Sequence, residues 1–520
     1  MDIPHQTPSR SSGLATATFD TLDPATGTVT GTYPIRSEAA VRAAVGRARA
    51  EALWWADLGF DERGRHLTAW KVSMVERLPE LVEIMRRETG KPGGDAMLEV
   101  TLAIDHLAWA AGHAKKVLGR RRVPAGLLML NQSASVAYKP LGVIGVIGPW
   151  NYPVFTPLGS IAYALAAGNA VVFKPSEYTP GVGVWIADRF EEAVGRPVLQ
   201  AITGLGATGS ALCRAGVDKI AFTGSTATGK RVMAACADTL TPVVIEAGGK
   251  DSLIVDADAD IPAAADAAVW GAFSNAGQTC IGVERVYVHE KVYDAFVDAL
   301  TAKARHLQAG ADGKIGPITM PSQLNVIRSH VQDALDKGGR AVVGGLHAVG
   351  ERYVQPIVLL DVPEDSLAVQ QETFGPTVTV TKVRDMNHAV ELTNATPYGL
   401  GNTVFSRRSG MAVAERIRSG MSSVNSVISF AGIPSLPFGG VGDSGFGRIH
   451  GADGLKEFTY AKAIARQRFR PLLTLTTFER SARADRLLAK ALRLVHGGRP
   501  RHEDRAHRPG RTAGGRPHAR

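Results

Sequence analysis

A long uncharged stretch limits what this chain can fold into. From Leu141 to Phe173 there is no charged side chain. Pro149, Pro153 and Pro157 interrupt the stretch, so it lacks the unbroken apolar run of about 20 residues that a membrane span needs. It predicts a buried strand (VIGVI), a loop (GPWNYP), a buried helix (around IAYALAAG) and a second buried strand (AVVF). Such fully buried strands are typical of a parallel sheet covered on both faces.

The rest of the chain alternates between strand-like and helix-like runs. The strand-like runs are AVVFK, KIAFTG, TPVVIEAGG, SLIVDADA and RVYVHE, and the helix-like runs are GVGVWIADRFEEAV, TGKRVMAACADTL and AAADAAVWGAFSNAG. A second round of strands follows from about Ile315, in GRAVVGG, YVQPIVLLDV, TVTVTKV and GNTVFS. This order predicts βαβ units and an α/β fold. A length of 520 residues predicts two or three domains.

Composition excludes several classes of protein. Three cysteines do not make a disulfide framework, so we expect a reducing compartment, the cytoplasm. The N-terminal MDIPHQTPSRSSG has no apolar signal-peptide core. The net charge is +10, but residues 498–520 hold seven arginines against Glu503 and Asp504. We therefore expect a disordered basic tail over 497–520 and no binding of nucleic acid.

A glycine-bounded turn follows the strand-like KIAF. Residues 221–230 read AFTGSTATGK, and a helix-like run comes next. Free amides at such a helix start attract phosphate. A P-loop is one interpretation, but Arg231 stands where Ser or Thr must hold Mg²⁺. A dinucleotide turn of unusual spacing and a plain β–α turn are the other two.

Three further motifs place polar side chains beside buried strands. Lys174 and Glu177, in KPSE, could hold ribose hydroxyls or could be ordinary surface charges. Glu246 ends VVIE, where burial would raise its pKa and suit it to accept a proton, unless it is a capping or ion-paired glutamate. Asn151, in GPWNYP, is either a rigid oxyanion donor or a turn former.

In this order, the motifs resemble those of the aldehyde dehydrogenase superfamily. The matching segments run from about Ala15 to Arg468 and are GPWNYP, KPSE, FTGSTATG, EAGGKD, FSNAGQTC, ETFGPTV, PYGLGNTVFS and PFGGVGDSGFGRIHG. The resemblance implies a Rossmann-like NAD-binding domain (15–122 and 139–247), an α/β catalytic domain (248–440) and a small β-hairpin flap of oligomerisation strands (123–138 and 456–470). It also implies a homodimer or homotetramer.

The resemblance implies that Cys280, in FSNAGQTC, is the nucleophile. A partly exposed polar loop would permit the thiolate to form and to attack an aldehyde carbon. The Asn151 side-chain amide and the Cys280 backbone N–H would stabilise the oxyanion. Hydride transfer then leaves a thioester, and Glu246 activates the water that hydrolyses it to a carboxylic acid. Cys213 and Cys236 lie in helical patterns and are expected to be small buried residues.

The cofactor residues also follow from the resemblance, and no metal site is expected. Trp150 would lie near the nicotinamide, Lys174 and Glu177 at the adenosine ribose, Gly224, Ser225 and Gly229 at the pyrophosphate, and Glu372 and Phe374 at the nicotinamide ribose and ring. Ala247 and Gln371 depart from the usual family residues without removing a catalytic group. Because Glu177 would repel a 2′-phosphate, we expect NAD, with NADP as the alternative.

The loop from Asn425 to Gly440 would line the substrate entrance. It carries Ile428, Phe430, Ile433 and Leu436 and no charge. No arginine there could hold a second carboxylate, so we expect an apolar aliphatic or aromatic aldehyde as substrate. The alternatives are a succinate-semialdehyde-type dehydrogenase that uses NADP and a non-catalytic structural relative.

Residues 471–496 are expected to form an amphipathic C-terminal extension. Ala484, Leu487, Leu488, Ala491 and Val495 share one helical face, and Arg483, Arg486, Lys490 and Arg493 share another. Such a basic amphipathic helix either packs its leucines on the enzyme or makes a weak contact with a membrane surface.

Overall fold

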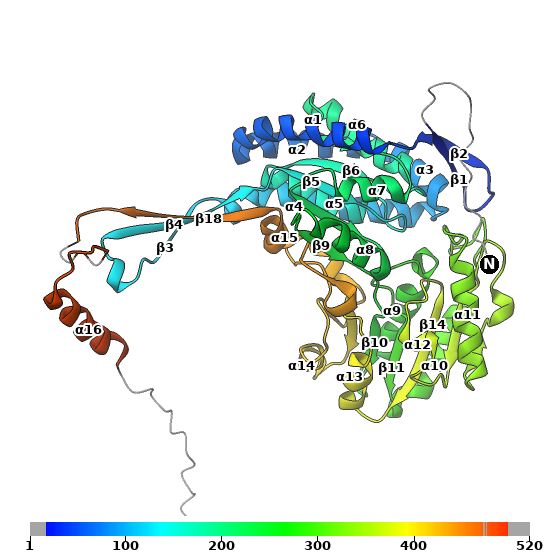
Figure 1. Cartoon of the computed structure of the whole chain (residues 1–520). Helices are drawn as coiled ribbons and strands as arrows, with labels where there is room; N and C mark the ends of the chain where they lie inside the picture. Colours follow the sequence, from blue (N-terminus) through cyan, green and yellow to red (C-terminus); the bar gives the residue numbers. More distant parts are fainter. Residues whose placement is uncertain (1–16, 472–473, 475, 498–520) are drawn as a thin grey trace, which may run out of the picture. The chain divides into compact units, whose positions relative to one another are not determined.

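The computed structural model describes residues 17–471, 474 and 476–497. The basic tail predicted beyond Gly497 therefore lies outside the described residues. The chain divides into two compact units, one of Met1–Arg121 with Val136–Lys462 and one of Arg122–Ser135 with Ala463–Arg520. Figure 1 labels the elements along the chain.

The first large sheet of the larger unit has six strands in the order β17-β9-β8-β5-β6-β7. Its strands are β5 (Val143–Ile147), β6 (Ala170–Lys174), β7 (Leu199–Ala201), β8 (Lys219–Thr223), β9 (Val243–Glu246) and β17 (Gly445–Phe446). All pair in parallel except β17, which runs antiparallel to β9. The parallel sheet predicted from the uncharged stretch is confirmed.

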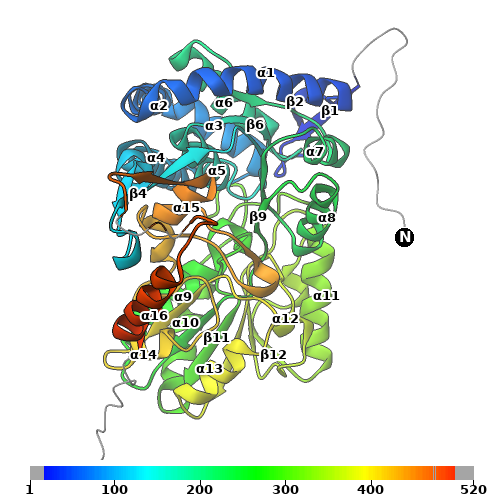
Figure 2. The ribbon, with the colours of Figure 1, turned by 60° about the vertical axis from the view of Figure 1, so that its left-hand side comes forward.

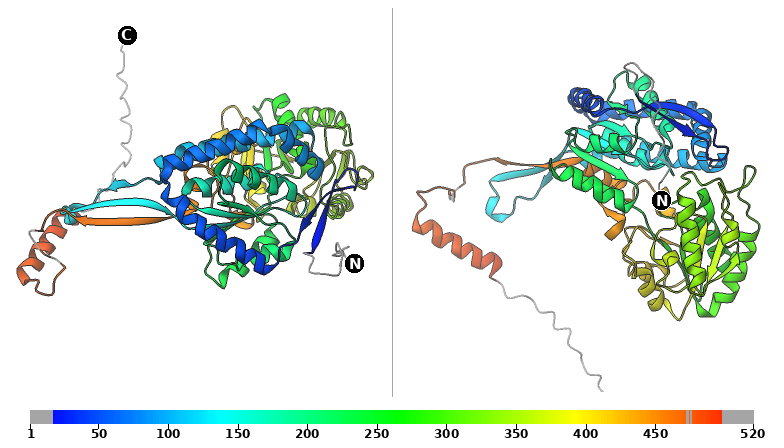
Figure 3. Two further views of the ribbon diagram at one scale, coloured as in Figure 1. Left: turned by 90° about the horizontal axis from the view of Figure 1, so that it is seen from above. Right: turned by 45° about the vertical axis from the view of Figure 1, so that its right-hand side comes forward.

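Helices cover this sheet on both faces. They are α1 (Glu38–Asp57), α2 (Gly59–Glu76), α3 (Leu78–Thr89), α4 (Gly93–Leu118), α5 (Phe155–Ala167), α6 (Pro180–Val194), α7 (Gly206–Cys213) and α8 (Thr226–Ala237). Figures 1 and 2 show α1, α2 and α6 together at one end of this unit and α8 beside β9. The views of Figure 3 show the long N-terminal helices on the outside.

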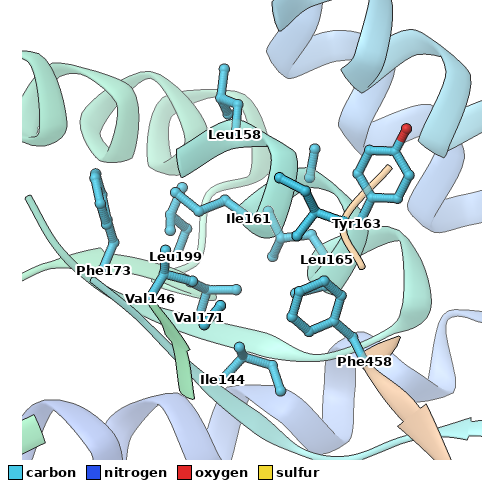
Figure 4. Close-up of a cluster of buried hydrophobic side chains, with 14 of the residues drawn as sticks. Ile144, Val146, Leu158, Ile161, Tyr163, Leu165, Val171, Phe173, Leu199 and Phe458 are labelled. Atoms are coloured by element: carbon cyan, nitrogen blue, oxygen red, sulfur yellow. The ribbon is translucent and has the colours of Figure 1, made fainter. Parts of the chain in front are cut away.

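The uncharged stretch forms the centre of this half. Every residue of α5 except Thr156 is buried, and the helix ends at Gly168 with a left-handed φ of 103°. Figure 4 shows α5 side chains such as Leu158 and Ile161 packed against Ile144 of β5 and Val171 of β6. A helix that is apolar all round must be covered all round, which explains why the stretch carries no charge.

The second large sheet has seven strands in the order β12-β13-β14-β11-β10-β15-β16. They are β10 (Ser252–Val255), β11 (Arg285–His289), β12 (Arg340–Val343), β13 (Ile357–Leu360), β14 (Thr377–Val383), β15 (Asn402–Phe405) and β16 (Ser423–Val424). Only β12 pairs antiparallel. The helices that accompany this sheet are α9 (Ile261–Phe273), α10 (Tyr293–Arg305), α11 (Gln323–Asp336), α12 (Leu367–Gln370), α13 (Met386–Asn394) and α14 (Gly410–Ala414). The short helix α15 (Gly451–Glu457) contacts α4 and α5 of the first half.

Two smaller sheets complete the fold. β1 (Thr18–Leu22) and β2 (Val29–Pro34) form an antiparallel hairpin. A three-stranded sheet has the order β18-β4-β3, with β3 (Arg121–Val123), β4 (Gln132–Pro140) and β18 (Thr459–Gln467). The chain of β4 and β18 runs from one compact unit into the other. The predicted domain boundaries and the oligomeric role of these strands stay predictions.

The last described helix is α16 (Ala482–His496) of the smaller unit. The Ser481 side chain caps it by accepting a hydrogen bond from the Ala484 N–H. Leu487 and Leu494 are exposed, at 49% and 86%. Across the described ranges, no helix combines the length and apolarity that a membrane crossing requires.

Candidate active site

The turn that precedes Cys280 has a strained backbone. Asn275 and Ala276 follow α9 with left-handed φ values of 51° and 55°. Non-glycine residues in this region cost on the order of 1–3 kcal/mol each. Gly277 comes next at φ 70°, and a Cβ there would lie 2.0 Å from the Gly375 carbonyl oxygen. The chain therefore turns sharply and carries Cys280 in a loop ahead of β11.

Cys280 lines a pocket with mostly apolar walls. The apolar side chains are Leu98, Leu102, Phe155, Trp270, Ile281, Ile428 and Phe438. The charged residues of the wall are Lys91, Asp95 and Glu99, and no described wall residue is an arginine. Lys91 forms an ion pair with Glu99, and neither side chain is exposed. Its ammonium is therefore already neutralised and does not offer a free positive charge to a substrate.

The predicted substrate loop lies only partly at this pocket. Ile428 lines the pocket as expected, but Phe430 is buried and is not in its wall. Ile433 and Leu436 are 44% and 41% exposed and are not in the pocket wall, and their place at the substrate entrance stays a prediction. The four apolar positions of the loop can be read from the sequence, but the direction in which each side chain points cannot.

Asn151 is buried in the loop between β5 and α5. Its side-chain amide donates a hydrogen bond to the Gln278 carbonyl at 2.9 Å, which leaves one amide hydrogen for another acceptor. Its backbone carbonyl accepts hydrogen bonds from Lys91 Nζ at 2.9 Å and Asn275 Nδ2 at 3.1 Å. Among the described residues, none accepts from the Cys280 backbone N–H. Both predicted oxyanion donors thus have an N–H available.

Glu246 is the last residue of β9 and is buried. Burial raises the pKa of its carboxyl to about 8, opposed by a hydrogen bond from Thr223 and by the charge of Arg448. The predicted direction of this shift is confirmed. Its backbone pairs with Gly445 of β17. At neutral pH the group is therefore largely protonated, and it can accept a proton in the fraction that is ionised.

The state of the Cys280 thiol differs from the expectation. A partly exposed polar loop was expected to permit ionisation, and Cys280 is partly exposed, but desolvation by the surrounding protein raises the pKa of the thiol well above its usual range. The nearby carboxyl groups of Glu372 and Glu246 raise it further, because a second negative charge beside them is unfavourable. The sequence shows polar residues around Cys280 but not the two acids that fold beside it.

The residues predicted for the phosphate and adenosine follow β8 and β6, two strands of the first sheet that lie on either side of β5. Ser225 caps α8 and accepts a hydrogen bond from the Thr228 N–H. The first amides of α8, of Thr226 and Ala227, have no acceptor in the described part of the chain. Gly229 is buried in the first turn of α8, and Gly224 precedes the cap. Such a helix start can bind a phosphate group.

At the end of β6, Lys174 donates a hydrogen bond to Glu177 Oε2 at 3.3 Å. The Lys174 side chain is almost fully buried, whereas that of Glu177 is 39% exposed. The carboxylate of Glu177 is therefore open to a ligand, and the ammonium of Lys174 lies beside it.

The residues predicted for the nicotinamide end also lie together. The rings of Trp150 and Phe374 meet edge to face, with centroids 5.6 Å apart. Glu372 accepts a hydrogen bond from the Gly249 N–H at 3.0 Å. A Cβ on Gly248 would lie 2.1 Å from Glu372 Oε2, so this carboxyl could not keep its place against the EAGGKD segment if Gly248 carried a side chain. Burial raises the pKa of Glu372 to about 8.

Sequence reasoning missed two buried ion pairs beside this site. One joins Lys91 to Glu99, and the other joins Lys250 to Glu284. Eight residues separate the first pair in the chain and 34 the second, so neither has the spacing of a helical pair. Only the fold brings them together.

Comparisons of this sequence with a family model and with known proteins point to one enzyme family. Residues 11–464 match the family model of the aldehyde dehydrogenase family. The chain is 36% identical over 452 residues to a 4,4'-diapolycopene aldehyde oxidase of Methylomonas sp, covering 85% of this chain and 84% of that protein. It is 34% identical over 457 residues to a glutarate-semialdehyde dehydrogenase of Pseudomonas aeruginosa, covering 86% of this chain and 94% of that protein.

Solved structures agree with the sequence comparison. An NAD-dependent aldehyde dehydrogenase from Sinorhizobium meliloti superposes with a TM-score of 0.84 at 33% identity, covering 88% of this chain and 93% of that one. An NADP-dependent enzyme of E. coli superposes with a TM-score of 0.82 at 31% identity, covering 86% of this chain and 95% of that one.

Proposed function

The chain belongs to the aldehyde dehydrogenase family, and from this premise we propose that it oxidises an apolar aliphatic or aromatic aldehyde to the carboxylic acid with NAD. The observation that carries the substrate class is the pocket at Cys280. Its walls are apolar, and its lysine, Lys91, is already paired with Glu99. A second carboxylate on the substrate would meet no free cation there, while Asp95 would repel it.

The family resemblance and the geometry support one division of roles. Cys280 forms a bond to the aldehyde carbon, and its proton leaves to a base or solvent because the resting thiol is neutral. The free amide hydrogen of Asn151 and the Cys280 backbone N–H stabilise the oxyanion. After hydride loss a thioester remains on Cys280. Glu246 takes a proton from water, which attacks the thioester and releases the acid and the thiol.

The residues present fit a nicotinamide dinucleotide. The unsatisfied amides at the start of α8 suit a pyrophosphate, and the open Glu177 carboxylate suits ribose hydroxyls. Trp150, Phe374 and Glu372 would hold the nicotinamide end. When bound, the dinucleotide accepts the hydride. Relatives include an NAD-dependent and an NADP-dependent enzyme, so the preference for NAD is supported by Glu177 alone.

A panel of aldehydes, assayed with both cofactors by following the reduced cofactor, tests this proposal. It should contain straight-chain aliphatic aldehydes, benzaldehyde and a polyene aldehyde, with succinic and glutaric semialdehydes as the acidic set. The relatives are named for a 4,4'-diapolycopene aldehyde and for glutarate semialdehyde, so both classes belong in the panel. A higher kcat/KM for either semialdehyde than for every apolar aldehyde would overturn the substrate class.

We also propose two contacts outside the active site. β18 is an edge strand of its three-stranded sheet and leaves backbone groups that a second copy of the chain can pair with, which supports a homodimer or homotetramer. The α16 helix has an exposed apolar face flanked by Arg483, Arg486, Lys490 and Arg493, and none of these is in an ion pair in the described part of the chain. This combination fits an anionic lipid surface. A cytoplasmic location stays a prediction.

A further inference from the structure

We propose that Glu99 and Glu284, each in a buried ion pair with a lysine, are positioning residues for the two sides of the active site. The Lys91–Glu99 pair would fix the loop of Asn151, and the Lys250–Glu284 pair would fix the segment of Glu372 and Phe374. The inference rests on the roles given above to Asn151 and Phe374. Neither glutamate is assigned a part in the chemistry.

The Lys91–Glu99 pair holds the Asn151 loop at its middle and at its C-terminal end. Glu99 Oε1 accepts hydrogen bonds from the backbone N–H groups of Val154 at 2.8 Å and Phe155 at 3.1 Å. Glu99 Oε2 accepts from Lys91 Nζ, which also donates to the Asn151 carbonyl at 2.9 Å. The pair therefore ties the start of α5 to the backbone of the residue whose amide would meet the oxyanion.

The Lys250–Glu284 pair is built in the same way on the other side. Glu284 Oε1 accepts hydrogen bonds from the backbone N–H groups of Thr373 at 3.0 Å and Phe374 at 2.9 Å, and the Thr373 N–H is shared with Glu284 Oε2 at 2.9 Å. Glu284 Oε2 also accepts from Lys250 Nζ, which donates to Thr373 Oγ1 at 3.3 Å. Each glutamate thus accepts two consecutive backbone N–H groups on one oxygen and a lysine on the other, and in Glu284 the lysine-bound oxygen also shares the Thr373 N–H.

The Phe374 backbone shows why such support is needed. Its φ is 53°, in the left-handed region that a bulky residue seldom adopts. Strain of this kind persists only where surrounding bonds over-determine it. The hydrogen bonds from the Thr373 and Phe374 N–H groups to one buried carboxylate are charge-assisted and therefore strong. They hold the ring of Phe374 against Trp150.

Both oxygens of each carboxylate face hydrogen-bond donors, so replacing the glutamate with glutamine puts an NH₂ group against a donor. In Glu99→Gln or Glu284→Gln, one oxygen becomes an NH₂ group, which must face either two backbone N–H groups or an ammonium. The side chain keeps its size, but one half of the support is lost. The two substitutions should then affect different parameters. The Asn151 loop would contact the oxyanion and so affect kcat, whereas the segment of Glu372 and Phe374 would contact the cofactor and so affect NAD affinity.

The experiment measures kcat with a saturating aldehyde and the dissociation constant of NAD by titration. Glu99→Gln should lower kcat by about tenfold to a hundredfold, because a misplaced oxyanion donor acts on the chemical step, and should leave NAD affinity within about twofold. Glu284→Gln should weaken NAD binding about tenfold and lower kcat less at saturating NAD. The control is Asp61→Asn, which breaks an exposed ion pair with Lys115 and should change neither parameter.

Folding is checked by thermal unfolding and gel filtration. If a single variant fails to fold because its lysine is left unpaired, the neutral double variants Lys91→Met/Glu99→Gln and Lys250→Met/Glu284→Gln replace it. These variants still lack the lysine hydrogen bonds to Asn151 and Thr373. We therefore expect the first to lower kcat and the second to weaken NAD binding, as for the single variants. Folded variants with wild-type kcat and NAD affinity, or with equal losses in both parameters, would overturn the inference.

Two reference variants separate this inference from the proposed function. Asn151→Ala should lower kcat, and Phe374→Ala should weaken NAD binding. If Asn151→Ala keeps the wild-type kcat, the oxyanion role itself is wrong. If Asn151→Ala loses activity and Glu99→Gln does not, the oxyanion role stands and the positioning role of Glu99 is wrong.

Discussion

The Glu246 carboxyl accepts a hydrogen bond from the Thr223 hydroxyl at 3.2 Å, and its other oxygen is buried without a partner among the described residues. Burial raises the pKa of Glu246 to about 8, and the Thr223 hydrogen bond opposes this shift because it favours the ionised form. These two residues therefore set the pH range in which Glu246 can take a proton from water.

We predict that thioester hydrolysis accelerates as the pH rises towards about 8 and then levels off. Below that pH most of Glu246 is protonated, so the fraction that can act as a base falls about tenfold per pH unit. Glu246→Gln should slow hydrolysis by about a hundredfold or more and abolish this pH dependence. Rapid-mixing assays over a pH series should then show a burst of reduced cofactor and a trapped acyl-enzyme. Loss of the burst itself would mean that Glu246 has another role.

Thr223→Val should move the midpoint of the same profile to higher pH. The substitution removes the hydrogen bond that lowers the pKa of Glu246, so the carboxyl ionises later. The profile of hydrolysis against pH is the measurement, and Thr239→Val, at an exposed position, is the control. An unchanged midpoint would show that the Thr223 hydroxyl does not act on Glu246.

The Cys280 thiol should react slowly with iodoacetamide at neutral pH in the absence of cofactor. Burial and the nearby Glu372 raise its pKa, so little thiolate is present, and the alkylation rate should climb with pH well past neutrality. Glu372→Gln removes a neighbouring acid and should speed alkylation above about pH 8, where Glu372 is ionised. Cys280→Ala is the control, because Cys213 and Cys236 are buried. A rate that levels off below about pH 8 would contradict the raised pKa.

The sequence predicted the large sheets better than the site. Buried parallel strands such as VIGVI carry a local signal, because every side chain must be apolar, and the structure has β5 there. β17 carries no such signal. It has two residues, Gly445 and Phe446, and exists because the chain returns to the edge of β9. Pairing of this kind between distant segments is not visible in local patterns.

The same distinction applies to the charged groups. The raised pKa of Glu246 was predicted because a glutamate at the end of an apolar strand is buried whatever lies around it. The raised pKa of Cys280 was not predicted, since it depends first on desolvation by the folded protein and then on Glu372, which is 92 positions away by residue number. The Lys91–Glu99 and Lys250–Glu284 pairs were missed for the same reason.

The α16 helix should bring the enzyme to anionic vesicles. Its exposed apolar face and four cations fit an interfacial position, where each Lys or Arg near an anionic surface contributes about 1 kcal/mol. Flotation with vesicles of anionic and of neutral lipid, comparing the full chain with one truncated after Gln467, is the measurement. Binding should need anionic lipid and weaken with salt.

A matched control for that experiment keeps the helix and removes its apolar face. Leu487→Gln and Leu494→Gln together should reduce flotation in the full chain, because both side chains are exposed at present. Equal flotation of the full and truncated chains would end the membrane proposal. It would leave the packing of α16 on protein as the remaining interpretation.

NAD should be preferred to NADP because of Glu177. Its carboxylate is partly exposed and lies beside Lys174, where it can accept hydrogen bonds from ribose hydroxyls. The 2′-phosphate of NADP would bring a second negative charge to the same place. Lys174 opposes this effect, because an ammonium attracts a phosphate.

The measurement is kcat/KM for each cofactor in the wild type, Glu177→Gln and Lys174→Met. Glu177→Gln should narrow the preference for NAD about tenfold, and Lys174→Met should not reverse it. A wild type that prefers NADP, or a ratio unchanged in Glu177→Gln, would show that this carboxylate does not select the cofactor.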